Sequence, residues 1–315
     1  MKHYLNINDL ENLQSTVQEA IDLKNNELKF STLGKGRTIC LLFFNNSLRT
    51  RLSTQKAAQN LGLNAIVMNF GSEGWQLEYE DGVIMNKDKS EHVKEAAKVI
   101  AQYCDIVAIR AFASLTDKEK DLAEIVLLNF KKYAGIPVVN MESAVGHPLQ
   151  ALADAITLEE NKTLHKPKVV LSWAPHPKAL PHAVANSFVE MMQLQDANFV
   201  ITHPEGYELN PTITKDSTIE YDQKKAFENA DFVYVKNWSS FKDYGKVVCE
   251  DENWMITGDK MGVTNNGKFM HCLPVRRNVV VADEVIDSEN SIVIEQANNR
   301  TYSAQIVLKK VLENL

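Results

Sequence analysis

The sequence predicts an α/β fold of two doubly wound domains, each with a parallel sheet covered by helices on both faces. Its 315 residues exceed what one ordinary hydrophobic core organises, which favours two domains of about 150 residues each. Short apolar runs alternate with amphipathic stretches, a pattern typical of parallel strands joined by helices. The second half of the chain repeats this alternation without repeating the sequence. In such folds a ligand binds at the carboxyl ends of the strands, here in the cleft between the domains.

The first half contains the clearest strand. The apolar run 38–44 (TICLLFF) predicts a buried strand, and 93–103 and 118–133 have the spacing of amphipathic helices. Further strands are predicted at 64–68, 105–109 and 137–139.

The second half follows the same pattern after a polar segment. Residues 159–168 contain a proline and are the predicted crossing between the halves. A last helix is predicted at 299–315. The strands of this half are predicted at 168–172, 198–202, 232–235, 269–271 and 291–294.

Composition narrows the class of protein. Hydrophobic residues make up 44% and charged residues 24%, as in ordinary soluble globular proteins. The net charge of −7 disfavours binding to nucleic acid or to an anionic membrane, so an anionic substrate must be held by a few local cations. No apolar run is long enough to span a bilayer, and the first residues do not resemble a signal peptide. Four dispersed cysteines without a CxxC pair predict a cytoplasmic protein with neither metal nor disulfides.

The first chemical motif, NNSLRTR, follows the strand at 38–44. It places Ser47, Arg49, Thr50 and Arg51 where a helix should begin. A helix N-terminus offers unpaired N–H groups to a phosphate, and the hydroxyl and guanidinium groups add donors. The alternative interpretation is an ordinary helix cap with two solvated arginines.

The second motif, HPLQALAD at 147–154, also lies where a strand gives way to a helix. His147 and Gln150 are three residues apart and can point into the same crevice, where they suit a carbonyl oxygen and an amide nitrogen. Alone, a histidine before a proline is more often part of a loop.

The third motif, HCLPVRRN at 271–278, ends a predicted strand. Pro274 stops the ladder there, and the resulting kink can turn main-chain carbonyls toward a ligand amine. The alternative interpretation of Cys272 is a small buried residue. We do not predict a nucleophile, because the only nearby base is His271, and alternation along the strand turns it to the opposite face.

Together, and in this order, the three motifs resemble the aspartate/ornithine carbamoyltransferase family over nearly the whole chain. The resemblance implies a carbamoyl-phosphate-binding domain at 1–150, with the helix 299–315 packed back on it, and a substrate domain at 151–298. It also implies a homotrimer with active sites shared between subunits. No pattern for a cofactor is present, and the turn NNSLRTR lacks the GxGxxG of a nicotinamide-dependent oxidoreductase.

The resemblance implies a set of residues that bind carbamoyl phosphate, each carried over from the matching motif. Arg49, Thr50, His147 and Cys272 are also the expected catalytic residues. Without the resemblance, Arg110 and Arg300 would be interpreted as surface salt-bridge residues. The full set is Ser47, Leu48, Arg49, Thr50, Trp75 (from a neighbouring subunit), Arg110, His147, Gln150, Cys272, Leu273 and Arg300.

One departure from the ornithine enzymes concerns the substrate. They carry an aspartate after the strand at 232–235, which pairs with the α-ammonium of ornithine, followed by Ser-Met-Gly. Here Lys236 takes that place and Ser-Met-Gly is absent; the lysine would repel an ammonium and suits a carboxylate or an amide. The chain thus resembles the N-acetylornithine and N-succinylornithine carbamoyltransferases, with an acylated substrate amine. This subgroup implies the substrate residues Glu142, His176, Lys236, Arg276 and Ser90.

Two positions favour a succinyl group on the acceptor. The acetyl enzymes are expected to have glutamate at Ser90 and lysine at Val280, and a glutamate there would repel a succinyl carboxylate. The succinyl enzymes carry proline at Ser90, so the serine leaves open a natural variant, an engineered change or relaxed specificity. N-acetyl-L-ornithine is the alternative acceptor, and a catalytically silent homologue is a further alternative. The subgroup also implies a knotted second domain, with Pro175, Pro177 and Pro181 in its loop.

Overall fold

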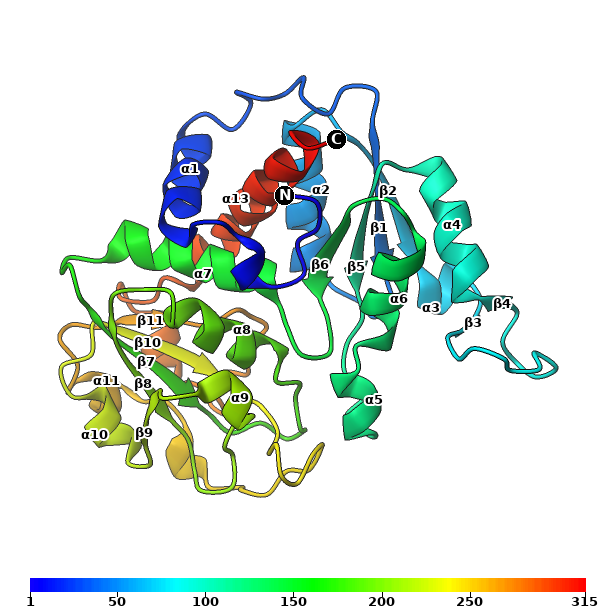
Figure 1. Cartoon of the computed structure of the whole chain (residues 1–315). Coiled ribbons are helices and arrows are strands. Elements are labelled where there is room, and N and C mark those ends of the chain that lie inside the picture. Colours follow the sequence, from blue (N-terminus) through cyan, green and yellow to red (C-terminus); the bar gives the residue numbers. More distant parts are fainter. The chain divides into compact units, whose positions relative to one another are not determined.

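The structure is a computed structural model that describes residues 1–315. The chain forms two compact units: one comprises Met1–Leu152 with Arg300–Leu315, and the other comprises Ala153–Asn299. The chain passes from one unit to the other inside two helices, α7 (Pro148–Asn161) and α13 (Val293–Leu312). Each unit has its own parallel sheet, which confirms the predicted α/β class (Figure 1).

The sheet of the first unit has the strand order β2-β1-β5-β6, with every pair parallel. The chain fills one side of β1 first and then crosses to the other, so the switch in strand order lies between β1 and β5. Tyr4 forms a parallel bridge to Val139 and extends the sheet beyond β6. The strands are β1 (Thr38–Phe43), β2 (Asn64–Asn69), β5 (Ile106–Arg110) and β6 (Val138–Glu142).

Helices cover both faces of this sheet (Figure 1). Two of them, α4 (Val93–Tyr103) and α6 (Ile125–Tyr133), pack against one face through buried side chains such as Phe130. The other face carries α1 (Leu13–Asn25), α2 (Arg49–Asn60) and α13.

The predicted helix at 118–133 is two helices. A break separates α5 (Lys118–Leu122) from α6, because Glu124 has a positive φ of 45° that a helix cannot contain. A continuous helical pattern in the sequence cannot reveal such a single left-handed residue.

A two-stranded excursion projects from the first unit beyond α3 (Phe70–Glu73) (Figure 1). It is held by β3 (Leu77–Glu78) and β4 (Glu91–His92). The Glu78 carboxylate accepts the N–H of Glu80 and the Lys89 ammonium, and these bonds lower the pKa of Glu78 to about 2. The segment between the strands is exposed, and Ile84 is 80% exposed.

The sheet of the second unit has the order β11-β10-β7-β8-β9 and is also parallel. Its strands are β7 (Lys168–Trp173), β8 (Asn198–Thr202), β9 (Thr218–Glu220), β10 (Phe232–Lys236) and β11 (Lys268–Met270). Its remaining helices are α8 (Ala183–Met192), α9 (Pro211–Thr214), α10 (Gln223–Phe227), α11 (Gly258–Met261) and α12 (Asp283–Ile286).

The prediction of a strand at 291–294 is wrong. Only Ser291 forms a bridge, to Phe269, and α13 begins at Val293, earlier than the predicted start at 299. Ile292 and Val293 are buried at the start of a helix, and a four-residue apolar run does not distinguish that from a strand. The predicted crossing at 159–168 is also partly helical, since α7 continues to Asn161. No helix has the length and apolar character needed to cross a bilayer.

Candidate active site

The N-terminus of α2 lies where the sequence predicts a phosphate-binding turn. The helix begins at Arg49, shortly after β1, and the Ser47 hydroxyl accepts a hydrogen bond from the backbone N–H of Thr50 at 3.2 Å. The side chain of Thr50 is buried, whereas Leu48 is 66% exposed. The first N–H groups of a helix carry positive partial charge, so this turn suits a phosphate and Leu48 can contribute only backbone to it.

Arg110 ends β5 beside this turn. Its Nη1 donates to the carbonyls of Asn45 and Asn46 at 3.1 and 2.8 Å, and its Nη2 lies 3.0 Å from the Glu142 carboxylate. The guanidinium lies 4.0 Å from the ring centroid of Phe112. Burial lowers the pKa of Arg110 and Glu142 partly opposes this, so the buried group remains a cation. The sequence did not predict the supporting roles of Asn45, Asn46 and Phe112.

Arg300 joins the same cluster from α13, far along the chain. Its Nη2 donates to the Thr50 hydroxyl at 2.5 Å and lies 3.2 Å from His147 Nε2. Gln150 is buried in the first turn of α7, and the charge of Arg49 contributes to the lowered pKa of Arg110. The fold therefore brings predicted residues of the first two motifs together with Arg110 and Arg300 in the first unit.

Glu142 is the last residue of β6, and its carboxylate neutralises part of the positive charge of the arginine cluster. Its Oε2 lies 3.0 Å from Arg110 Nη2 and 3.5 Å from His147 Nε2, and its side chain is buried. The sequence predicted Glu142 as a contact for the acceptor substrate. Its partners here are phosphate-cluster residues, so the same carboxylate also stabilises the buried cations.

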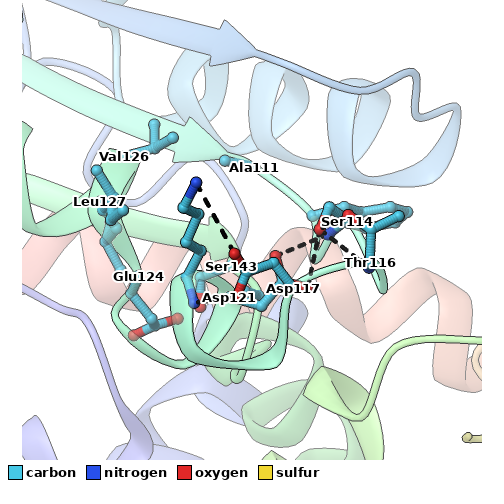
Figure 2. Close-up of a pocket in the computed structure, with 13 residues that line it drawn as sticks. Ala111, Ser114, Thr116, Asp117, Asp121, Glu124, Val126, Leu127 and Ser143 are labelled. Carbon is cyan, nitrogen blue, oxygen red and sulfur yellow. Dashed lines mark hydrogen bonds and ion pairs between the residues drawn. The ribbon is translucent and has the colours of Figure 1, made fainter. Parts of the chain in front are cut away.

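A hollow of about 510 Å³ opens beside this cluster, after the carboxyl ends of β5 and β6 (Figure 2). Three carboxylates line it. Asp121 accepts the N–H of Ser114 at 2.8 Å, and burial raises the pKa of Glu124. Asp117 is the third carboxylate, and the ammonium of Lys120, which also lines the hollow, lies 3.8 Å from it. The hollow therefore has mixed charge, whereas the arginine cluster beside it is cationic and attracts a phosphate.

The third motif lies in the second unit, after β11. Cys272 is buried, and Leu273 has a positive φ of 56°, which is uncommon for a residue with a side chain. The N–H of Leu273 donates to His271 Nδ1 at 2.8 Å. The kink expected from Pro274 is therefore present as a left-handed turn held by a side chain.

Three cationic or potentially cationic groups gather in the second unit. Arg276 Nε lies 3.2 Å from His176 Nε2, and His176 Nδ1 is 2.8 Å from the carbonyl of Lys178. Burial lowers the pKa of His176, and the charges of Arg276 and Lys236 lower it further. Such a group suits a substrate carboxylate. Val280 is buried in the core of this unit.

Trp75 and Ser90 belong to the projecting excursion. The Trp75 indole N–H donates to Glu91 at 2.8 Å and the side chain is 56% exposed. The N–H of Ser90 donates to the carbonyl of Gln76 at 3.2 Å. None of these hydrogen bonds reaches the arginine cluster of the same chain.

Comparison with known proteins gives matches over both units. The model of the aspartate/ornithine carbamoyltransferase carbamoyl-P binding domain matches residues 2–160. The model of the Asp/Orn binding domain of the same family matches residues 181–311.

Individual relatives match over the full length. An N-succinylornithine carbamoyltransferase from Bacteroides fragilis is 51% identical, with 100% of both chains covered. An N-acetylornithine carbamoyltransferase from Xanthomonas axonopodis pv. citri is 34% identical over 98% of this chain and 96% of its own. A solved structure of N-acetyl-L-ornithine transcarbamylase, with a glutamate replaced by serine and complexed with carbamyl phosphate and N-succinyl-L-norvaline, is 35% identical. It covers 99% of this chain and 100% of its own, with a TM-score of 0.92.

The buried pair of Arg110 and Glu142 gives a prediction for stability. Arg110→Met leaves a buried carboxylate without its main cation, which costs about 3–5 kcal/mol of unfolding free energy. Adding Glu142→Gln removes that charge, so the double variant should recover part of the loss. Thermal and urea unfolding of the wild type, both single variants and the double variant measure the coupling. A double variant whose loss equals the sum of the single losses would contradict the pairing.

Proposed function

This chain belongs to the aspartate/ornithine carbamoyltransferase family, and we propose that it transfers a carbamoyl group from carbamoyl phosphate to the δ-amine of N-succinyl-L-ornithine. The products are N-succinyl-L-citrulline and phosphate, as in arginine biosynthesis in the cytoplasm. The observation that carries the proposal is the buried cluster of Thr50, His147, Arg110 and Arg300 at the N-terminus of α2. The intact cluster argues against a catalytically silent homologue.

The cluster supplies the charge that the reaction needs. The amine attacks the carbamoyl carbon, and the resulting tetrahedral intermediate carries negative charge on the former carbonyl oxygen. In this proposal Arg49, Thr50 and His147 stabilise that oxygen, as donors in an oxyanion hole do. Arg110, Arg300 and the helix N-terminus neutralise the phosphate as it leaves.

Proton transfer needs no dedicated side-chain base in this proposal. The amine attacks in its neutral form, a carbon–nitrogen bond forms, and the bond from carbon to the phosphate oxygen breaks. The departing phosphate takes the proton that the nitrogen loses. Gln150 and the backbone of Cys272 and Leu273 hold the carbamoyl amine, so catalysis consists of positioning and electrostatic stabilisation.

The group of Lys236, Arg276 and His176 supports an acceptor with two carboxylates. N-succinylornithine has an α-carboxylate and a succinyl carboxylate, whereas N-acetylornithine has the first alone. The relative that is 51% identical is named for the succinyl substrate. Structural neighbours in which one glutamate is replaced by serine, alanine or valine are complexed with N-succinyl-L-norvaline, so a succinyl ligand is compatible with the loss of that carboxylate. The 34% identical relative named for N-acetylornithine supports the alternative acceptor.

We further propose that the protein is a homotrimer in which the excursion reaches the active site of a neighbouring subunit. The exposure of Trp75 and of the apolar residues Val83, Ile84 and Met85 supports this proposal. Such contiguous exposed apolar side chains are typical of interaction sites. Trp75 and Ser90 would then complete a site whose arginines come from the partner.

The acceptor proposal predicts a substrate preference. Carbamoylation of N-succinylornithine should exceed that of N-acetylornithine by about 10- to 100-fold in kcat/KM, because one more carboxylate pairs with a cation. Ornithine itself should react poorly. Product formation from carbamoyl phosphate with each amine at equal concentrations is the measurement.

Ser90→Glu tests the origin of that preference. The added carboxylate should repel the succinyl group and lower its kcat/KM while affecting N-acetylornithine less. A wild type that prefers N-acetylornithine would leave the reaction standing and refute the acyl assignment.

The phosphate cluster predicts a loss of turnover in Arg49→Ala. Without this guanidinium the developing charge is less stabilised, and kcat should fall at least about 100-fold while the protein stays folded. Arg37→Ala is the matched control, since Arg37 precedes β1 and lies at the amino end of the sheet. Near-normal turnover in Arg49→Ala would refute the assignment of this site.

Sharing of sites predicts complementation between two inactive variants. Arg49→Ala and Trp75→Ala should each be nearly inactive as pure proteins. In randomly mixed trimers, about a quarter of the sites combine an intact Arg49 with an intact Trp75 from the neighbour, so activity should return. Mixed and unmixed preparations are compared by carbamoyl transfer and by sedimentation. No recovery in proven hybrid trimers would contradict shared sites.

A further inference from the structure

The backbone after β11 is held in a conformation that its sequence disfavours. Leu273 has a φ of 56°, and for a residue with a branched side chain this left-handed conformation is strained. Strain of this kind persists only where the surroundings impose it, and it gathers at functional sites. The hydrogen bonds made by the residues next to Leu273 therefore indicate which groups hold it in this conformation.

The first of these contacts is made by His271. Its Nδ1 accepts the N–H of Leu273 at 2.8 Å, which requires that Nδ1 carry no proton. The histidine is itself buried. This bond closes the left-handed turn from within the motif.

The second contact fixes His271. Its backbone N–H donates to Gln296 Oε1 at 2.9 Å, and Gln296 Nε2 donates to Asp154 Oδ1 at 2.7 Å. Gln296 and Asp154 are both fully buried. Because the amide nitrogen of Gln296 donates to Asp154, Asp154 orients the glutamine amide and leaves Oε1 facing His271.

Tyr234 of β10 lies next to the motif as well. Its hydroxyl is fully buried near Asp154 and Cys272. Burial raises the pKa of Tyr234, and the two neighbouring groups raise it further. The hydroxyl therefore stays protonated beside the carboxylate.

A fully buried carboxylate is a costly way to hold a backbone. Apolar residues of similar volume usually stabilise a core as well or better, so a buried charge gives no net stability by itself. Here the buried carboxyl group is the last member of a chain of three hydrogen bonds that begins at the N–H of Leu273. The arrangement therefore fits positioning better than bulk stability.

We propose that Asp154, Gln296 and His271 form a relay that positions the backbone of Cys272 and Leu273. This inference rests on the proposed function, in which that backbone holds the carbamoyl amine. The three residues of the relay touch no substrate and act through the turn that they hold. Leu273 keeps its left-handed conformation only while the relay is complete.

Gln296→Met tests the relay because methionine has a similar shape and lacks the amide. We expect kcat to fall about 10- to 100-fold through misplacement of the backbone, with the KM for carbamoyl phosphate changed less than threefold, since the phosphate contacts lie elsewhere. Gln305→Met is the matched control. Gln305 is also buried in α13 and also makes two hydrogen bonds, with Asn60 and with the carbonyl of Glu27. Its loss should lower the melting temperature similarly and leave kcat unchanged.

His271 provides a second test with a conservative rescue. His271→Asn keeps an oxygen that can accept the Leu273 N–H, whereas His271→Leu removes the acceptor. We expect most of the turnover to survive in the asparagine variant and about a tenfold or greater loss in the leucine variant.

The outcomes separate the relay from the proposed function. Carbamoyl transfer by the wild type with kcat equal in Gln296→Met and Gln305→Met refutes the relay alone, as do equal losses in His271→Asn and His271→Leu. A wild type that transfers no carbamoyl group to any acylornithine refutes the proposed function instead. If Gln296→Met does not fold, the two His271 variants decide by the same comparison.

Discussion

The main constraint on the first unit is that buried cations, among them Arg110 and Arg300, must be stabilised away from water. They lie close together in a chain whose net charge is −7. Arg110 is buried and must be compensated, and Glu142 provides a carboxylate at 3.0 Å from it. The same oxygen lies 3.5 Å from His147, so one buried anion serves two groups. The guanidinium of Arg110 is already fixed by two carbonyls and this carboxylate, and that of Arg300 by Thr50 and His147. A phosphate that enters the cluster therefore requires less ordering of these groups when it binds.

Parallel strands make this concentration of charge possible. β1, β5 and β6 all end at the same edge of one sheet. Ser47 to Thr50 come shortly after β1, Arg110 is the last residue of β5, and Glu142 is the last residue of β6. A doubly wound sheet therefore collects residues that are a hundred positions apart. Arg300 arrives differently, on a helix that begins in the second unit and ends in the first.

The parts that could be predicted from the sequence are those with a local pattern. The strand at 198–202 and the helix at 93–103 have the predicted bounds, because apolar spacing determines them. The prediction of a strand at 291–294 was wrong because a short buried helical turn has the same composition. The helix break at Glu124 was missed because no local sequence pattern marks it. Arg110 and Arg300 could be placed only through resemblance, and Gln296 was missed because a buried polar residue in a helix looks like a surface residue.

In the proposed function, catalysis and the choice of acceptor depend on different residues. This explains why the acceptor was harder to predict from the sequence than the reaction. The groups that meet the phosphate are held by short contacts within one unit, from Thr50 to Arg300 and from Arg110 to Glu142. The residues proposed to select the acceptor lie elsewhere: Ser90 in an exposed excursion, and Lys236 and Arg276 in the second unit. Changes at such positions leave the buried charge cluster intact. One chemistry can therefore serve ornithine, acetylornithine or succinylornithine, because a new acceptor requires no change to the groups that stabilise the transition state.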